Sequence, residues 1–174
     1  QEEGAVSRLV PFKTSYYNQQ NVDTELSYDL LVNSYNYGNV INPDVYFDYY
    51  SVRSIIGFRY PFLKTATELM RKKDTEKAIL LADKYFSSLP TSTDVLDPVS
   101  IKMAAIYVNT SHEEGYKWVD YLLSEYQLQY NYIILLERKG GYLSADGNRL
   151  KQYSQQCIGE LKTLKNKIGK VILE

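Results

Sequence analysis

The chain has 174 residues, enough for one domain of ordinary size. Its 20 basic and 21 acidic residues nearly cancel, so charge gives no reason to expect a nucleic-acid or anionic-membrane partner. A single cysteine, Cys157, and a single histidine, His112, exclude an internal disulfide, a thiolate metal cluster and a multi-histidine zinc site. Aromatic usage is unbalanced, with 18 tyrosines against 5 phenylalanines and 1 tryptophan.

The N-terminal quarter, residues 1–44, is predicted to form an irregular arm that docks in part on the rest of the chain. Residues 4–12 favour a short extended segment, since they carry an apolar pair and end at a proline. A short helix is expected at residues 29–32. From residue 45 to 174 the apolar pattern is helical, and we expect a helical-repeat domain there within a chain that is one domain overall.

Two helices are predicted in the stretch that follows the arm. Asp48 is a typical N-cap, because its carboxylate can accept the free N–H groups of a first turn. Pro61 has no N–H to donate and is expected to interrupt or kink this helix. Asp74 predicts the start of a second helix, which should stop before Pro90.

Three further helices are predicted in the second half of the chain. Asp97-Pro98 indicates an N-cap followed by a proline at the first helical position. Ser111 with Glu114 three residues later predicts a capping box at the start of the next helix, and Gly140-Gly141 should end it. A final helix is expected over residues 146–172.

The two helix pairs in the middle of the chain repeat with an offset of about 37 residues. The matching positions are Phe62 and Val99, Leu69 and Ile106, Asp74 and Ser111, Ala78 and Gly115, Ala82 and Val119, and Phe86 and Leu123. Ala78 and Gly115 are small residues at the expected helix crossings. The pattern resembles the tetratricopeptide repeat, with Phe62, Ala66 and Leu69 at the family's Trp, Gly and Tyr positions. We predict an all-α fold of about five to seven helices, with tetratricopeptide-like hairpins and an extended N-terminal arm; an irregular helical bundle is the alternative.

The residues with the greatest potential for binding are a set of tyrosines and arginines around the first long helix. They are Tyr46, Tyr49, Tyr50, Arg53, Arg59 and Tyr60. Tyrosine and arginine are typical of binding surfaces, and a tyrosine ring also suits stacking on a sugar. The alternative is that these tyrosines pack between the helices and the arm.

Catalytic and metal chemistry are not indicated. His112 is expected at the surface near a helix start, and Cys157 falls on an apolar stripe as a small core residue. No phosphate-loop, zinc-protease or nucleophile-elbow motif occurs. We therefore name no catalytic residue, metal ligand or cofactor. The lysines of the final helix favour a solvated face, with anionic lipid headgroups as the alternative.

Short motifs in the first part of the chain resemble a known family. They are Gly4 to Pro11, Tyr37-Gly38-Asn39, Asn42 to Asp48, Arg53 and Phe58-Arg59. They are similar to the C-terminal region of a multi-spanning membrane-protein family of the Bacteroides group. That family has no known function and is grouped with protein O-mannosyltransferase-like glycosyltransferases. The similarity covers residues 4 to about 90 and departs at Tyr49-Tyr50, where acidic and amide residues are expected.

The resemblance implies a periplasmic tail whose arm leads into tetratricopeptide-like helices. The family's presumed catalytic acids lie in its membrane part. We therefore expect a non-catalytic periplasmic accessory domain of a glycosyltransferase-like membrane protein, which binds a protein or glycan partner and contacts the membrane only through spans that would precede Gln1. The alternatives are a carbohydrate-binding module that uses the tyrosine and arginine set, and a free-standing helical-repeat scaffold. An enzyme in its own right is disfavoured by the single histidine.

Overall fold

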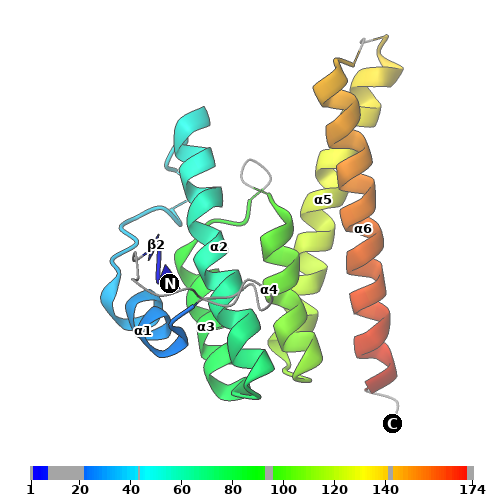
Figure 1. The fold of residues 1–174 in the computed structure, drawn as a ribbon. Coiled ribbons are helices and arrows are strands. Elements are labelled where there is room, and N and C mark those ends of the chain that lie inside the picture. The colour runs from blue at the N-terminus through cyan, green and yellow to red at the C-terminus, as the bar shows by residue number, and fades with distance from the viewer. Residues whose placement is uncertain (1, 8–21, 43, 93–95, 141–142, 172–174) are drawn as a thin grey trace. The chain divides into compact units, whose positions relative to one another are not determined.

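The computed structural model describes residues 2–7, 22–42, 44–92, 96–140 and 143–171 (Figure 1). The chain forms two compact units, Gln1–Pro90 and Thr91–Glu174. Within the described residues both are mainly helical, which confirms the predicted all-α fold. Of the helices in the described ranges, none combines the length and the apolarity needed to cross a bilayer. The boundary expected at residue 44 and tetratricopeptide-like packing stay predictions.

The first unit begins with two short strands and a short helical segment. The strands β1 (Glu2–Glu3) and β2 (Val6–Ser7) pair in antiparallel fashion. Helix α1 (Thr24–Asp29) follows and continues into one turn of π-helix, η1 (Leu30–Ser34). The short helix predicted at residues 29–32 is therefore present and is longer than expected.

The turn between the two strands docks on the helical segment that follows. The Gly4 N–H donates a hydrogen bond to the Ser27 hydroxyl over 2.8 Å. Gly4 has a φ of 59°, a left-handed conformation that favours glycine, and it lies close to the Tyr35 ring. Of the extended arm predicted over residues 4–12, the part from residue 8 onward lies outside the described residues.

The main hairpin of the first unit is formed by α2 (Tyr49–Arg71) and α3 (Thr75–Ser88). The predicted caps at Asp48 and Asp74 are confirmed. The expected interruption at Pro61 is wrong, because α2 continues through it. The carbonyl that Pro61 leaves without an N–H partner belongs to Gly57, four residues earlier. Since Gly57 is exposed, water can hydrate that carbonyl and the helix continues.

The facing sides of these two helices bury the core of the first unit. Its fully buried apolar residues on the hairpin are Phe62, Ala66 and Leu69 of α2, and Ala78, Leu81, Ala82 and Tyr85 of α3. They recur every three or four residues, as an amphipathic helix requires. The rings of Phe62 and Tyr85 meet edge to face at 5.5 Å, which adds aromatic pairing to the hydrophobic burial.

The second unit consists of α4 (Pro98–Asn109), α5 (Glu114–Arg138) and α6 (Ala145–Val171). Helix α5 packs against both of the others, and α4 also contacts α6. The predicted cap at Asp97 and the predicted helix end near Gly140 are confirmed. The buried residues that join the three helices include Met103, Ala104, Tyr107, Val119, Leu122, Tyr126, Cys157 and Leu161.

The two hairpin turns share one closing motif. In each, a residue other than glycine adopts the left-handed conformation just after the first helix: Lys73 at φ 63° and Ser111 at φ 55°. Two backbone hydrogen bonds close each turn: Lys73 to Met70 (3.1 Å) and Asp74 to Leu69 (3.0 Å), and Ser111 to Val108 (3.2 Å) and His112 to Tyr107 (2.8 Å). This is the Schellman pattern of helix ends. The shared motif aligns Lys73 with Ser111, whereas the sequence repeat had matched Asp74 with Ser111.

The shared turn motif changes the role predicted for Ser111. Its N–H is used to close α4, and α5 begins only at Glu114, with no side-chain cap from the preceding residue. The predicted capping box is therefore wrong. The close crossing predicted at Gly115 is present, because an added Cβ would lie 3.1 Å from both the Tyr107 Cβ and the Val108 N.

Candidate functional site

The start of α2 and the segment just before it carry the three most exposed tyrosines of the predicted set. Asp48 fixes the first turn, because its carboxylate accepts the Ser51 N–H over 2.7 Å, and this bond lowers the pKa of the carboxyl. Tyr46, Tyr49 and Tyr50 are 89%, 67% and 77% exposed. At these exposures the three side chains are not buried among the described residues, and they are accessible to a partner.

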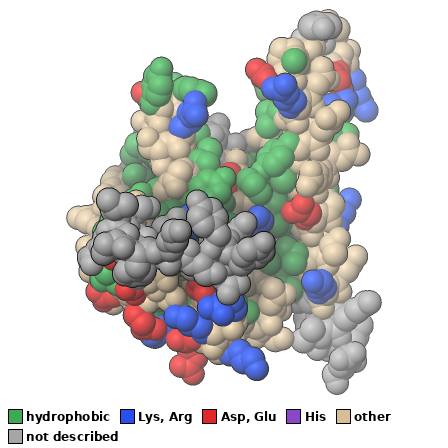
Figure 2. All heavy atoms as spheres, in the orientation of Figure 1, with side chains coloured by type: hydrophobic (Ala, Val, Ile, Leu, Met, Phe, Trp, Pro, Cys, Tyr) green, Lys and Arg blue, Asp and Glu red, His purple; other side chains and the backbone are tan. Residues whose placement is uncertain are grey.

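This end of α2 projects beyond the helix with which it pairs. Helix α2 has 23 residues and α3 has 14, a difference of roughly 13 Å at 1.5 Å per residue. The two helices join at the C-terminal end of α2, so the excess falls on residues 49–57. In that stretch only Ile55 is buried. The projecting end is visible in Figure 1, and Figure 2 shows hydrophobic side chains gathered on it.

Side-chain contacts order the aromatic groups on this first stretch of helix. Arg53 donates from Nη1 to the Tyr49 hydroxyl over 3.1 Å, and its guanidinium carbon lies 5.6 Å from the ring centroid. The two residues are four apart, the spacing that places side chains together on a helix. The Tyr49 and Tyr50 rings are 5.6 Å apart and nearly perpendicular. We call Tyr46, Tyr49, Tyr50 and Arg53 the aromatic end of α2.

The structure separates the other two predicted residues from this group. Arg59 is fully buried and donates a hydrogen bond to the Pro90 carbonyl, so it joins α2 to the segment after α3 inside the first unit. We therefore leave Arg59 out of the binding surface. Tyr60 is 48% exposed and lies about 16 Å along the helix from Tyr49. Tyr60 is therefore too far along the helix from Tyr49 to belong to the same contact surface.

His112 and Cys157, the residues best suited to act as a base, a nucleophile or a metal ligand, both take part in packing or hydrogen bonding within the fold. His112 is half-buried, stacks on Tyr107 and accepts the Glu114 N–H at Nδ1 over 3.4 Å. Cys157 is buried, as predicted, and burial raises the pKa of its thiol, which lowers its reactivity. Across the described ranges, no three His, Cys, Asp or Glu side chains come together to hold a metal ion.

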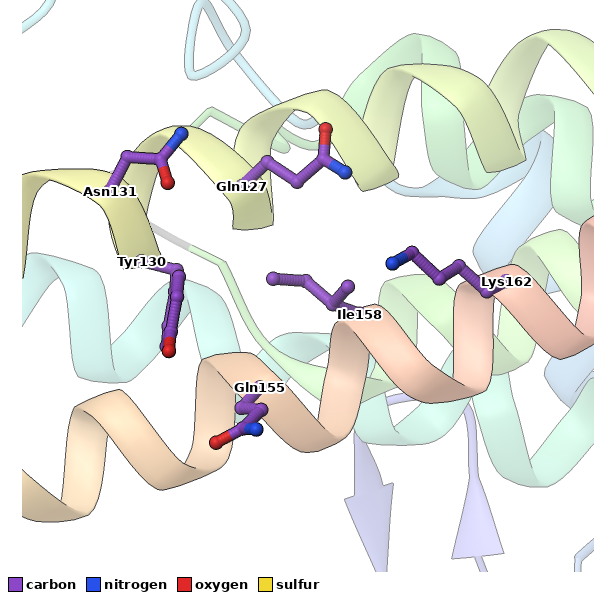
Figure 3. A pocket seen from close by; sticks show the side chains of 6 residues that line it. All are labelled: Gln127, Tyr130, Asn131, Gln155, Ile158 and Lys162. Carbon is purple, nitrogen blue, oxygen red and sulfur yellow. The ribbon is translucent and has the colours of Figure 1, made fainter. Parts of the chain in front are cut away.

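The structure also has a groove, lined mainly by residues with polar side chains, that the sequence did not indicate. It lies between α5 and α6, has a volume of about 490 Å³ and is open to solvent (Figure 3). Its lining residues are Gln127, Tyr130, Asn131, Gln155, Ile158 and Lys162. The i, i+4 pair of amides on α5 is visible in the sequence. Its alignment with residues of α6 depends on how the two helices pack, which no local pattern gives.

The fold and these surfaces define an all-α protein of helical hairpins that exposes an aromatic helix end and a groove between α5 and α6. Comparison of the chain with known protein families, with characterised proteins and with solved structures found no match. The residues themselves therefore carry the functional proposal.

Proposed function

We propose that this chain is a non-catalytic interaction domain that holds a protein partner on the aromatic end of α2. The observation that carries the proposal is the exposed pair Tyr49 and Tyr50, whose rings contact each other beside an ordered Arg53 on a projecting helix end; a third exposed tyrosine, Tyr46, lies just before that end. Tyrosine and arginine dominate the energetics of protein interfaces, and exposed aromatic clusters mark interaction sites. A projecting, convex surface fits a concave protein partner, whereas a small ligand needs a hollow.

The wider assignment rests on the sequence resemblance. We place the domain in the periplasm, as the accessory part of a glycosyltransferase-like membrane protein of the Bacteroides group, with tetratricopeptide-like hairpins as its scaffold. The surroundings of His112 and Cys157 support a role without catalysis, since one is engaged in a helix start and the other is buried.

A capture experiment tests the aromatic end directly. The full chain, immobilised, is exposed to an envelope extract of the organism that makes it, in parallel with a Tyr49→Ala/Tyr50→Ala variant. Tyr132→Ala is the matched control, since it removes a similarly exposed tyrosine (61%) from α5. Loss of a hot spot costs at least about 2 kcal/mol, or roughly 30-fold in affinity.

We expect one protein to be recovered by the parent chain and by Tyr132→Ala, and to be lost from the double variant. Equal recovery by all three chains would contradict the proposal. The measured Kd of the purified partner for each variant then gives the size of the effect.

A further inference from the structure

The groove between α5 and α6 has the composition of a binding site for a polyhydroxylated ligand. Three side-chain amides, one phenol, one ammonium group and one isoleucine line it, and no carboxylate does. Figure 3 shows these side chains coming from the two facing helices. Tyr130 and Ile158 are half-buried and form the apolar part, while the amides and Lys162 are exposed.

The polar groups of the groove are not used by the fold. Elsewhere on the same two helices, polar side chains pair with one another. Ser154 donates to Gln129 over 2.7 Å, Lys151 meets Glu137 at 2.6 Å and Lys165 meets Asp120 at 2.7 Å. Within the described ranges, by contrast, the five polar side chains of the groove make no hydrogen bond or ion pair with the protein. Their donors and acceptors are available to a ligand.

The available groups match a sugar more closely than other ligands. An amide both donates and accepts, as does a sugar hydroxyl, so Gln127, Asn131 and Gln155 can each bind one or two hydroxyls. The Tyr130 ring offers an apolar face to the C–H side of a pyranose. Lys162 has no acidic neighbour in the groove, which leaves its charge for an anionic group.

Other ligand classes fit less well. A nucleotide or a phosphate is usually held by several cations or a helix N-terminus, and the groove has a single ammonium group. A peptide needs pockets for its side chains, and Ile158 is the one apolar aliphatic residue of the groove. The volume lies in the range of ligand sites, and the open shape admits a chain longer than one ring.

We propose that this groove binds an acidic oligosaccharide, with a sugar ring on Tyr130, its hydroxyls on the three amides and its carboxylate on Lys162. This site shares no residue with the aromatic end of α2 and does not depend on the function proposed for it. The sequence analysis considered carbohydrate binding by the tyrosine and arginine set; this proposal assigns carbohydrate binding to the residues of the groove instead.

The test is titration of the full chain with a panel of uronate- and sialate-bearing oligosaccharides, each paired with its methyl ester. Binding is measured by calorimetry and by NMR chemical-shift perturbation. The variants are Tyr130→Ala and Lys162→Met, with Tyr132→Ala as the matched control on the same helix. Tyr49→Ala/Tyr50→Ala serves as a second control, and circular dichroism confirms that every chain is folded.

We expect at least one acidic oligosaccharide to bind the parent chain and both controls. Tyr130→Ala should weaken that binding at least tenfold. Lys162→Met should remove the preference for the acid over its ester. The proposal is overturned if no member of the panel binds the parent chain, if Tyr130→Ala binds as well as the parent, or if Lys162→Met keeps the preference for the acid over its ester.

Discussion

Replacing Gly115 by alanine should destabilise the second unit, because the new Cβ has no room. It would sit 3.1 Å from the Val108 N and 3.3 Å from the Tyr107 carbonyl carbon. These are backbone atoms inside or next to the last turn of α4, held by its hydrogen bonds, so they cannot move aside easily. Overpacking of this kind costs about 1–3 kcal/mol.

A second glycine, Gly159, serves as a control that separates the steric cost of the new Cβ from the gain in helix propensity. Gly159 lies in the interior of α6, is exposed, and a Cβ there would meet no described atom within 4 Å. Gly159→Ala should therefore stabilise the unit by about 0.5–1 kcal/mol. Gly115 lies in the first turn of α5, where the gain in propensity is smaller, so Gly115→Ala should show a net loss of about 1–2 kcal/mol.

Urea denaturation measures both variants. Trp118, the single tryptophan, lies on α5, so its fluorescence reports on the second unit, and circular dichroism follows the whole chain. With a slope of about 1–2 kcal/mol per molar urea, the two midpoints should separate by about 1 M or more, with Gly115→Ala the lower. If Gly115→Ala is as stable as Gly159→Ala, the crossing of α4 and α5 is not as close as described.

Three further changes have defined outcomes. Arg59→Met should destabilise the first unit by more than about 2 kcal/mol in urea unfolding, since it leaves a buried carbonyl without its donor, whereas exposed Arg53→Met should stay within about 0.5 kcal/mol. Pro61→Ala should raise the urea midpoint, by about 1–3 kcal/mol in free energy, because it restores a helix N–H; an unchanged midpoint would mean that the helix is already relaxed there. Burial raises the pKa of Tyr126 and Tyr153, so the folded state keeps protons that the unfolded state loses above pH 10. Stability should therefore be complete below pH 10 and fall as the pH rises further, and Tyr126→Phe should make that fall shallower; urea midpoints from pH 7 to 11 measure it.

Tyr126 is also informative at neutral pH. Its hydroxyl and that of Tyr153 lie near each other and near the Cys157 thiol, yet neither completes a hydrogen bond of ordinary geometry. A buried hydroxyl without a bond is costly, so removing it can be neutral or stabilising. Tyr126→Phe should accordingly leave the urea midpoint at pH 7 unchanged or raise it.

Helix starts were the most predictable part of the fold, because their signal is local. Asp48, Asp74 and Asp97 each cap the helix that their position predicts, since a cap involves only the next two or three residues. Ser111 has the same local signal, but it occupies the left-handed position that ends α4, and α5 begins three residues later without a side-chain cap.

The sequence predicted the candidate site correctly only for residues whose place in the chain already implied that their side chains are exposed. Tyr46, Tyr49 and Tyr50 precede the part of α2 that pairs with α3, and they are exposed. Arg59 has the charge of a surface residue but sits on the buried stripe of α2, and the carbonyl that accepts its hydrogen bond lies 31 residues later in the chain. Contacts of such separation depend on the folded arrangement and leave no trace in a short window of sequence.

The two Schellman turns have a consequence for how fast each hairpin forms. They confine the reversal of chain direction to residues 72–74 and 110–113. The entropy lost in closing such short loops is small, and the helix contacts that follow join residues close in sequence. Low contact order of this kind is associated with folding in microseconds to milliseconds. Each hairpin should therefore form quickly, and the apolar faces of its helices should be exposed only briefly in a newly made chain.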